Sequence, residues 1–462
     1  MDETATGSGP GDAEGPDGPV AIVGLGYVGT SLAAVLAEGG YRVRGVDVDA
    51  SVVDRVAAGE CPIEEPGITE RFERYADEGR IGASTDPATV ADCPAVLVTV
   101  GTPLSASDPD LSTSDPELSA VESATDDVAP YLDPDDLVVY RSTLPAGATE
   151  GTVAPRLAAG SELEPGRDVH LAFCPERMAE GSAYDDLTTT PVVVGGLSPA
   201  SREAAEAFWS SLGLETVPVS DPTAAELAKL ADNWWIDLNI ALANELALLS
   251  EELGTDALEV IEAANTLPKG QHHVNILYPG AGVGGSCLHK DPWFVAGLGD
   301  EYGLDLETPR VSRRANDRMP GHIVDLTREA LDGDLAGATV AVLGVSFKGG
   351  TDDTRNTPAV PIVEGLREGG ANVRVTDPYV PAGEVEDLLG TAPTRLPEAL
   401  AGADAVVVVT DHEAYRSLAP ETLRERVGRD SFAVVDGRHV FAWDAFDGTA
   451  VTYRGVGRGV RE

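Results

Sequence analysis

The chain has 462 residues, of which 42% are hydrophobic and 5% aromatic, so it can bury the cores of two or three domains. Its 78 acidic and 32 basic residues give a formal net charge of −46. That charge repels phosphate backbones and anionic headgroups, and it excludes nucleic acids and membrane surfaces as partners. Only Lys229, Lys269, Lys290 and Lys348 are lysines. An acidic, lysine-poor surface is typical of proteins kept soluble at high salt, so we expect a halophilic cytoplasm.

The N-terminus and the cysteines support the same compartment. The first residues are acidic, so we expect no signal peptide, and no apolar run approaches the roughly 18 residues of a membrane span. The cysteines are far apart and form no CxxC pair, which predicts neither a disulfide framework nor a metal site. They are Cys61, Cys93, Cys174 and Cys287. One of them is therefore available for catalysis.

Residues 1–19 hold almost nothing apolar and are expected to form a disordered acidic tail. From Val20, short apolar runs alternate with helical stretches such as Val28–Glu38. This alternation predicts a parallel α/β domain over residues 20–220. The expected strands are Val20–Val23, Arg42–Val46, Ala95–Val100, Leu137–Tyr140, Val169–Phe173, Val192–Val194 and Thr216–Val219.

The middle of the chain has a different pattern. Residues 223–253 contain neither Pro nor Gly and carry apolar residues at helical spacing, which predicts one long helix in a helical domain over 221–330. The α/β alternation returns over 331–462. Strands are expected there at Thr339–Leu343, Asn372–Thr376, Ala405–Thr410 and Phe432–Val435. The predicted fold class is therefore α/β, with two Rossmann-like α/β domains joined by a central helical domain with one long helix.

A glycine-rich turn joins the first strand to the first helix. Its glycines are Gly24, Gly26 and Gly29, with the spacing that permits a tight turn, close approach of a pyrophosphate and packing of the helix on the sheet. The helix N-terminus at Tyr27 and Val28 supplies N–H groups for the anion. Alone, this pattern also fits a plain turn. Asp47 ends the second strand and can bind ribose hydroxyls while repelling a 2′-phosphate, so NAD is the expected cofactor; Asp49 is a weaker candidate for that role.

A second glycine-rich segment, 279–287, ends in Cys287 and is followed by Lys290 and Asp291. A cation or a helix N-terminus beside a cysteine favours the nucleophilic thiolate. The alternative is a buried structural cysteine, which suits the other three better because glycine-rich loops make poor core. Pro292 suits a first helical position, so Asp291 is also expected to be the N-cap of a helix.

The predicted long helix carries Lys229 and Asn233 four residues apart, on one face. Together they can stabilise a developing alkoxide. The alternative for Lys229 is a solvated surface lysine, which the near-absence of lysine elsewhere disfavours.

Several motifs in the same order resemble the UDP-glucose/GDP-mannose dehydrogenase family from about Val20 to Arg438. Besides the two glycine segments they are Thr102-Pro103, Ser142-Thr143-Leu144-Pro145, Pro175-Glu176-Arg177, Lys229-Leu-Ala-Asp-Asn233, Asn244-Glu245, Phe347-Lys348 and Asp353-Thr354-Arg355. The resemblance implies an NAD domain, a central dimerisation domain and a C-terminal domain that binds the nucleotide-sugar. The expected assembly is a homodimer or a higher homo-oligomer.

The resemblance also implies a four-electron oxidation of a sugar C6 alcohol to a carboxylate, with two NAD⁺ used in succession. Cys287 would form a thiohemiacetal and then a thioester. Lys229 and Asn233 would hold the C6 oxygen, while Asp291 and Thr143 would position or activate water. The family's cofactor and substrate contacts fall on Thr102, Thr143, Glu176, Arg177, Glu180, Gly284, Lys348, Arg355 and Arg438. Glu176 is also a candidate for the hydrolytic water.

The sugar is a finer question. Cys174-Pro175-Glu176-Arg177, Gly-Val-Gly-Gly and Asp291-Pro292-Trp293-Phe294 are similar to the branch that oxidises UDP-N-acetylmannosamine. Ser286 and Lys290 are similar to UDP-glucose 6-dehydrogenases. We expect UDP-N-acetylmannosamine, with UDP-glucose as the alternative. The family usually has a substrate-binding arginine before the glycine loop, where His273 stands here.

The residues alone leave two other classes of protein as alternatives. A two-electron hydroxyacid or sugar-phosphate dehydrogenase would share the NAD domain but would have no use for Cys287. A non-catalytic NAD-binding regulator would not need Lys229, Asn233, Cys287 and Asp291 together.

Overall fold

The structure is a computed structural model that describes residues 18–103, 116–267 and 275–459. The chain divides into two compact units, residues 1–231 and 232–462, and each is described by itself. Helix α8 (Pro222–Leu253) begins in the first unit and continues into the second.

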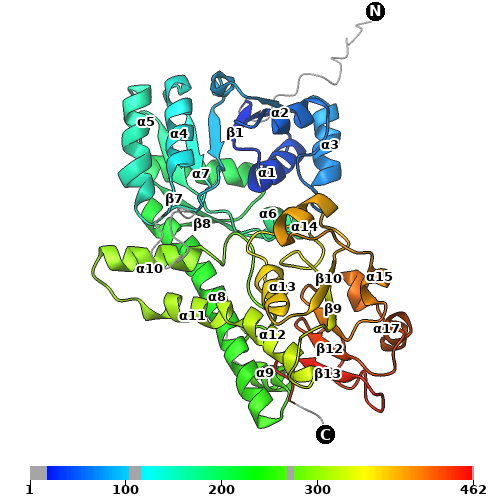
Figure 1. Cartoon of the computed structure of the whole chain (residues 1–462). Coiled ribbons are helices and arrows are strands. Elements are labelled where there is room, and N and C mark those ends of the chain that lie inside the picture. Colours follow the sequence, from blue (N-terminus) through cyan, green and yellow to red (C-terminus); the bar gives the residue numbers. More distant parts are fainter. Residues whose placement is uncertain (1–17, 104–115, 268–274, 460–462) are drawn as a thin grey trace, which may run out of the picture. The chain divides into compact units, whose positions relative to one another are not determined.

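An eight-stranded sheet forms the centre of the first unit, in the order β3-β2-β1-β4-β5-β6-β7-β8 (Figure 1). All neighbouring strands are parallel except β6 and β7, which pair antiparallel. The strands are β1 (Val20–Val23), β2 (Val43–Val46), β3 (Ile81–Ser84), β4 (Ala95–Val98), β5 (Leu137–Tyr140), β6 (His170–Phe173), β7 (Val192–Gly196) and β8 (Thr216–Pro218).

Both faces of this sheet are buried, as expected for parallel strands. Val20 and Ile22 of β1 belong to a core with α1, α3, α6 and α7, while Ala21 and Val23 belong to a core with α4 and α5. The alternation follows from the two-residue period of a strand. The helices are α1 (Tyr27–Glu38), α2 (Ala50–Ala57), α3 (Thr69–Asp77), α4 (Ser119–Val128), α5 (Ala154–Ser161), α6 (Ala183–Thr189) and α7 (Pro199–Ser211), with short turns at Pro87–Val90, Ala129–Tyr131 and Thr149–Val153.

The second unit combines helices with a five-stranded parallel sheet in the order β10-β9-β11-β12-β13 (Figure 1). Its strands are β9 (Thr339–Leu343), β10 (Asn372–Thr376), β11 (Ala405–Val408), β12 (Ala433–Asp436) and β13 (Thr452–Gly455). Its helices after α8 are α9 (Ala257–Asn265), α10 (Asp291–Glu301), α11 (Glu307–Asp317), α12 (Met319–Ala330), α13 (Ala359–Glu368), α14 (Ala382–Leu389), α15 (Leu396–Leu400), α16 (Glu413–Arg416) and α17 (Pro420–Val427).

The predicted fold class is confirmed, and the strands and the long helix lie within two residues of their expected positions. Two strands, β3 and β13, were missed. Both are edge strands with partly exposed residues, so they lack the continuous apolar runs of central parallel strands. The antiparallel β6–β7 pair corrects the expectation of a wholly parallel sheet. In the part of the chain that the structure describes, no helix is long and apolar enough to cross a membrane.

Candidate active site

The glycine-rich turn has the shape that a dinucleotide requires. Gly24 has φ +95°, a conformation that favours glycine. A Cβ on Gly29 would lie 1.9 Å from the carbonyl oxygen of Gly24, so helix α1 packs against the turn only because that side chain is absent. A Cβ on Gly26, in contrast, would meet nothing within 4 Å. The open space over Gly26, directly before the start of α1 at Tyr27, fits a pyrophosphate.

Asp47 stands beside this turn at the carboxyl end of β2. Its Oδ2 accepts a hydrogen bond from the Leu25 N–H at 2.6 Å, and its Oδ1 accepts from the Asp49 N–H at 2.9 Å. These two bonds fix the carboxylate beside the glycine turn, at the carboxyl end of β2. Asp49 is the N-cap of α2: its side chain accepts a hydrogen bond from the Ser51 N–H.

Glu65 was not singled out from the sequence, yet it connects the turn to another predicted segment. Tyr27 donates its hydroxyl to Glu65 at 2.6 Å, and Glu65 also accepts from the N–H groups of Gly181 (2.9 Å) and Ala183 (3.0 Å). Burial and the neighbouring carboxylates of Glu65 and Glu180 raise the pKa of Tyr27. No sequence motif marks Glu65, because its partners lie 38 or more residues away.

The loop after β5 carries Thr143. Thr102 donates its hydroxyl to the Thr143 carbonyl at 2.7 Å. Farther along the loop, Glu226 of α8 accepts from the N–H groups of Gly147 (2.5 Å) and Thr149 (2.8 Å). Burial raises the pKa of Glu226. These bonds fix the Thr143 loop to the first turns of α8, which also carry Lys229.

Lys229 and Glu176 lie together in the first unit. Their side chains are buried, and Lys229 Nζ is 3.9 Å from Glu176 Oε2. Glu176 also accepts from the Met178 N–H, and Arg177 donates to the Pro191 carbonyl. Lys229 is thus a buried ammonium beside a carboxylate, which corrects the alternative that it is a solvated surface lysine.

The second unit holds Cys287 directly before α10. The Cys287 carbonyl accepts from the N–H groups of Lys290 (3.1 Å) and Asp291 (2.9 Å). The Asp291 carboxylate is fully buried; it accepts from Asn233 Nδ2 at 2.5 Å and from Lys290 Nζ at 2.6 Å. Pro292 led us to expect Asp291 as the N-cap of this helix, and that expectation is wrong. Lys290 occupies the N-cap position, and Asp291 is the first residue of the helix.

The four cysteines differ in surroundings. Cys287 is partly exposed, whereas Cys61, Cys93 and Cys174 are buried. Burial raises the pKa of both Cys61 and Cys174 to about 11, and it raises that of Cys93 as well. These three thiols are held in the unreactive protonated form at neutral pH.

The glycine segment before Cys287 packs closely on residues 347–358. A Cβ on Gly284 would lie 2.5 Å from Phe347 Cβ. The Gly285 N–H donates to the Arg355 carbonyl at 2.8 Å, and Asn356 Nδ2 donates to the Gly285 carbonyl at 3.1 Å. Glycine is therefore needed here for packing against protein, besides any ligand.

Arg438 also links the glycine segment to the segment 347–358. Its guanidinium donates to the carbonyls of Val409 (2.8 Å), Gly282 (3.2 Å) and Phe347 (3.3 Å). Burial lowers the pKa of Arg438. Lys348 and Arg355 are exposed, and Arg355 pairs with Asp353.

Comparison with known proteins identifies the family. The UDP-glucose/GDP-mannose dehydrogenase family matches through its NAD binding domain at residues 19–212, its central domain at 223–318 and its UDP binding domain at 341–442. A UDP-N-acetyl-D-mannosamine dehydrogenase of Pyrococcus horikoshii is 35% identical over 95% of this chain and 99% of that protein. The chain belongs to the UDP-glucose/GDP-mannose dehydrogenase family. It is an NAD-dependent nucleotide-sugar dehydrogenase.

Solved structures agree with this assignment. The structure of UDP-D-ManNAc dehydrogenase from Pyrococcus horikoshii has a TM-score of 0.84 at 35% identity and covers 95% of this chain and 99% of its own. A UDP-glucose dehydrogenase from Pyrobaculum islandicum has a TM-score of 0.83 at 32% identity, covering 95% and 98%. An NDP-N-acetyl-D-galactosaminuronic acid dehydrogenase of Ralstonia nicotianae is 34% identical over 92% of this chain and 97% of that protein.

Behind Cys287, the dehydrogenase contains a buried polar network that sequence reasoning missed. Arg313 of α11 is fully buried and donates to Asp237 Oδ1 of α8 at 2.6 Å and to the Leu288 carbonyl at 3.1 Å. Asn316 donates to Asp237 at 2.7 Å, and Asn244 donates to Asn316 at 2.9 Å while accepting from the Gly280 N–H at 3.0 Å. The network holds both ends of the segment that carries Cys287. The available signal was the presence of charged residues, Asp237 and Arg313, on the buried faces of their helices.

The candidate residues of the dehydrogenase thus form one group in each unit. The first unit holds the glycine turn, Asp47, Thr102, Thr143, Glu176, Arg177, Glu180 and Lys229; the second holds Asn233, Gly284, Cys287, Asp291, Lys348, Arg355 and Arg438. Helix α8 carries Lys229 in one group and Asn233 in the other. His273 lies outside the described residues.

Proposed function

We propose that this dehydrogenase oxidises the C6 alcohol of a UDP-sugar to the carboxylate through a covalent intermediate on Cys287. The observation that carries this proposal is the arrangement after the glycine loop. A partly exposed cysteine stands beside a buried carboxylate whose two oxygens are held by Asn233 and Lys290. A two-electron alcohol dehydrogenase has no need of such a thiol.

The oxidation proceeds in balanced steps. Loss of a hydride and a proton converts the C6 alcohol to an aldehyde. The Cys287 thiolate adds to the aldehyde carbon, and the resulting alkoxide takes up a proton to give a thiohemiacetal. Loss of a second hydride and proton gives a thioester. Water then attacks the thioester carbon, which releases the carboxylate and restores the thiolate. When bound, NAD⁺ accepts each hydride.

The chain's own groups have distinct tasks in these steps. Lys229 and Asn233 bind the C6 oxygen and stabilise the charge that develops on it. Asp291, with Thr143 and Glu176, orients and deprotonates the hydrolytic water. The cofactor is held by the glycine turn, the start of α1 and two further residues: Gly24, Gly26, Tyr27, Val28, Gly29, Asp47 and Thr102. The remaining candidates are proposed to bind the nucleotide-sugar: Arg177, Glu180, His273, Gly284, Lys348, Arg355 and Arg438.

UDP-N-acetyl-D-mannosamine is the proposed substrate. Its support is the similarity to the Pyrococcus horikoshii enzyme of that name over almost the whole chain. UDP-glucose is the second candidate, favoured by the comparable fit to the Pyrobaculum islandicum UDP-glucose dehydrogenase and by Ser286 and Lys290.

The test measures NADH formed per sugar consumed across UDP-N-acetylmannosamine, UDP-N-acetylgalactosamine and UDP-glucose in molar salt. Two NADH per sugar supports the thioester route, and one refutes it. Cys287→Ser should stop formation of the acid, whereas Cys93→Ser, which changes a buried cysteine, should retain it. Iodoacetamide should label Cys287 and spare the three buried cysteines. Preference for UDP-glucose in this panel would replace the proposed substrate but keep the mechanism.

We also propose that the dehydrogenase forms a homodimer through α8. Within the second unit this helix exposes an apolar row of Trp235, Leu238, Leu242, Leu249 and Leu253, spaced by three, four or seven residues and so on one face. A second copy of the same helix can cover such a row. Sedimentation of the wild type and of Leu242→Glu tests this, with dissociation expected in the variant and a monomeric wild type contradicting the proposal.

The proposed environment is a salt-rich cytoplasm, supported by the charge of −46 and by the four lysines. Screening by salt reduces repulsion among the carboxylates. The melting temperature should therefore rise between dilute and molar potassium chloride. A melting temperature independent of salt would contradict this proposal.

A further inference from the structure

Arg141 is a buried cation that the proposed reaction does not use. It follows β5 directly, its backbone N–H donates to the Val98 carbonyl at 2.9 Å, and its residue is 5% exposed. The guanidinium lies over the ring of Trp209, 4.7 Å from the ring centroid. Its Nε and Nη1 are buried and hydrogen-bond to no atom of the described residues. Burying N–H groups of a guanidinium without acceptors is costly.

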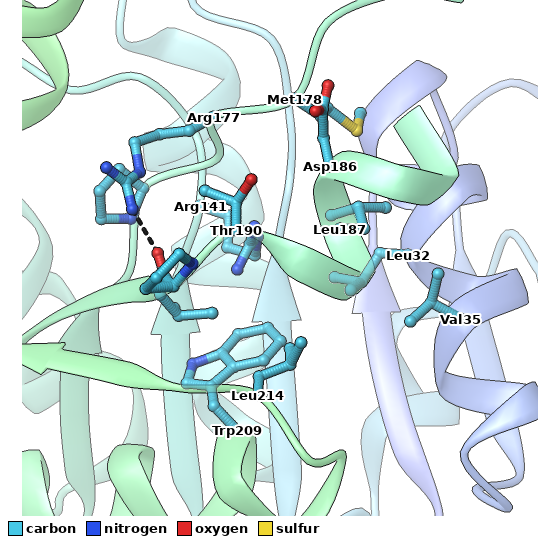
Figure 2. Close-up of a pocket in the computed structure, with 13 residues that line it drawn as sticks. Leu32, Val35, Arg141, Arg177, Met178, Asp186, Leu187, Thr190, Trp209 and Leu214 are labelled. Carbon is cyan, nitrogen blue, oxygen red and sulfur yellow. Dashed lines mark hydrogen bonds between the residues drawn. The ribbon is translucent and has the colours of Figure 1, made fainter. Parts of the chain in front are cut away.

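Arg141 lines a small cavity (Figure 2). Its volume is about 20 Å³, and its walls are largely apolar, with Leu32, Val35, Leu187, Leu214 and Trp209 among them. Roughly 10–15 Å³ of such space holds one water-sized group. The cavity therefore has room for a monatomic ion and is too small for a phosphate or a metabolite carboxylate.

The charges around the cavity favour an anion over a cation. Arg141 and Arg177 both contribute to the lining, and Arg177 donates to the Pro191 carbonyl. Asp186 is the acidic residue among the lining residues, and its Oδ2 already accepts from the Ala179 N–H (2.9 Å) and the Ser182 hydroxyl (2.8 Å). Glu176 lies close enough to attract Arg141 but leaves Nε and Nη1 unbonded.

An anion also suits these donors better than water does. A buried water needs two to four polar partners, including acceptors for its own hydrogens. Arg141 offers donors alone, and two of its N–H-bearing nitrogens, Nε and Nη1, need an acceptor. A monatomic anion accepts from two N–H groups and requires no acceptor, and a charged donor makes the stronger hydrogen bond.

We propose that this cavity is a binding site for one chloride-sized monovalent anion, held by Nε–H and Nη1–H of Arg141. The anion would neutralise the guanidinium and stabilise the first unit. The site lies wholly within that unit and is independent of the sugar that the dehydrogenase oxidises.

Bromide locates the site directly. Crystals of the wild-type protein grown with sodium bromide as the sole halide should show an anomalous bromine peak within hydrogen-bond distance of Arg141 Nε and Nη1. Density for a water or for a protein carboxylate at that place, with no bromine signal, would overturn the proposal. This measurement needs no variant and so does not depend on how well one folds.

Thermal unfolding tests the consequence in solution. At matched ionic strength, chloride and bromide should raise the wild-type melting temperature by a few degrees over gluconate, with saturation, because ligands that bind the native state stabilise it. Arg141→Met should lose this halide-specific increment. Arg167→Met removes an exposed arginine paired with Asp168 and should keep it. Equal melting temperatures of the wild type in chloride and gluconate would contradict the proposal.

Discussion

Asn233 donates a hydrogen bond to Asp291 at 2.5 Å, and both side chains are buried. The donor comes from α8 and the acceptor from the first residue of α10, four residues after Cys287. Lys290 occupies the other carboxylate oxygen at 2.6 Å. Asp291 is thus held by two donors from different parts of the chain, and its N–H in turn donates to the Cys287 carbonyl. The geometry couples the amide that we propose to bind the C6 oxygen to the segment that carries Cys287.

Replacing Asp291 by asparagine should uncouple hydrolysis from oxidation. The new amide would direct an NH₂ group at either Asn233 or Lys290, both donors, and it would lose the base. We expect kcat to fall by about 10²-fold or more, the usual contribution of general acid–base catalysis. Denaturing mass spectrometry should show the sugar thioester accumulating on Cys287. Asp305→Asn, at an exposed position after the same helix, should behave as wild type; normal turnover in Asp291→Asn would refute the role.

Gly26 and Gly29 should respond oppositely to alanine. A Cβ on Gly29 would meet the Gly24 carbonyl at 1.9 Å, so Gly29→Ala should lower the melting temperature strongly. A Cβ on Gly26 meets nothing within 4 Å and would project into the space proposed for the pyrophosphate. Gly26→Ala should keep the melting temperature and weaken NAD⁺ binding at least tenfold by calorimetry. Unchanged NAD⁺ affinity in Gly26→Ala would contradict the placement of the cofactor.

The sequence predicted features that depend on local spacing. The glycine turn, the central strands and the long helix follow from patterns within about 30 residues. The contacts of Glu65 with Tyr27 and of Arg313 with Asp237 could not be found in this way, since they join residues 38 and 76 positions apart. Asp291 shows the limit most clearly. Pro292 correctly indicated a helix start, but the N-cap position went to Lys290 while the carboxylate turned toward Asn233, a tertiary contact outweighing a local preference.

The buried pair of Arg313 and Asp237 should be important for stability. Both side chains are fully buried and 2.6 Å apart, so Arg313→Met leaves a carboxylate without its charge partner. Breaking such a pair costs about 3–5 kcal/mol. Arg318→Met removes an exposed arginine 3.3 Å from Glu245 and should cost at most about 1 kcal/mol. Chemical denaturation at fixed salt compares them, and equal losses would contradict the assigned importance. Faster alkylation of Cys287 in Arg313→Met would further show that the network positions its loop.

Asp377 should give the second unit part of its acid sensitivity. It follows β10, and its side chain is buried, which alone would raise its pKa. Hydrogen bonds from His412 Nε2 (3.0 Å) and the Val345 N–H (2.7 Å) outweigh burial and lower the pKa. A pKa lowered by folding contributes stability above the unfolded value, about 4 for aspartate, and this contribution is lost as the pH falls through the folded value. Asp377→Asn should therefore unfold more easily than wild type at neutral pH.

The difference between the two proteins in free energy of unfolding should shrink below about pH 4, because the wild-type carboxyl then becomes protonated. Denaturant titrations at constant ionic strength between neutral and acid pH measure it. Asp352→Asn changes an exposed aspartate in the same unit and should leave both the stability and its pH dependence unaltered. If Asp377→Asn differs from wild type by the same amount at every pH, the ionised carboxylate contributes nothing, and His412 is held by packing against Tyr379 and Tyr415 instead.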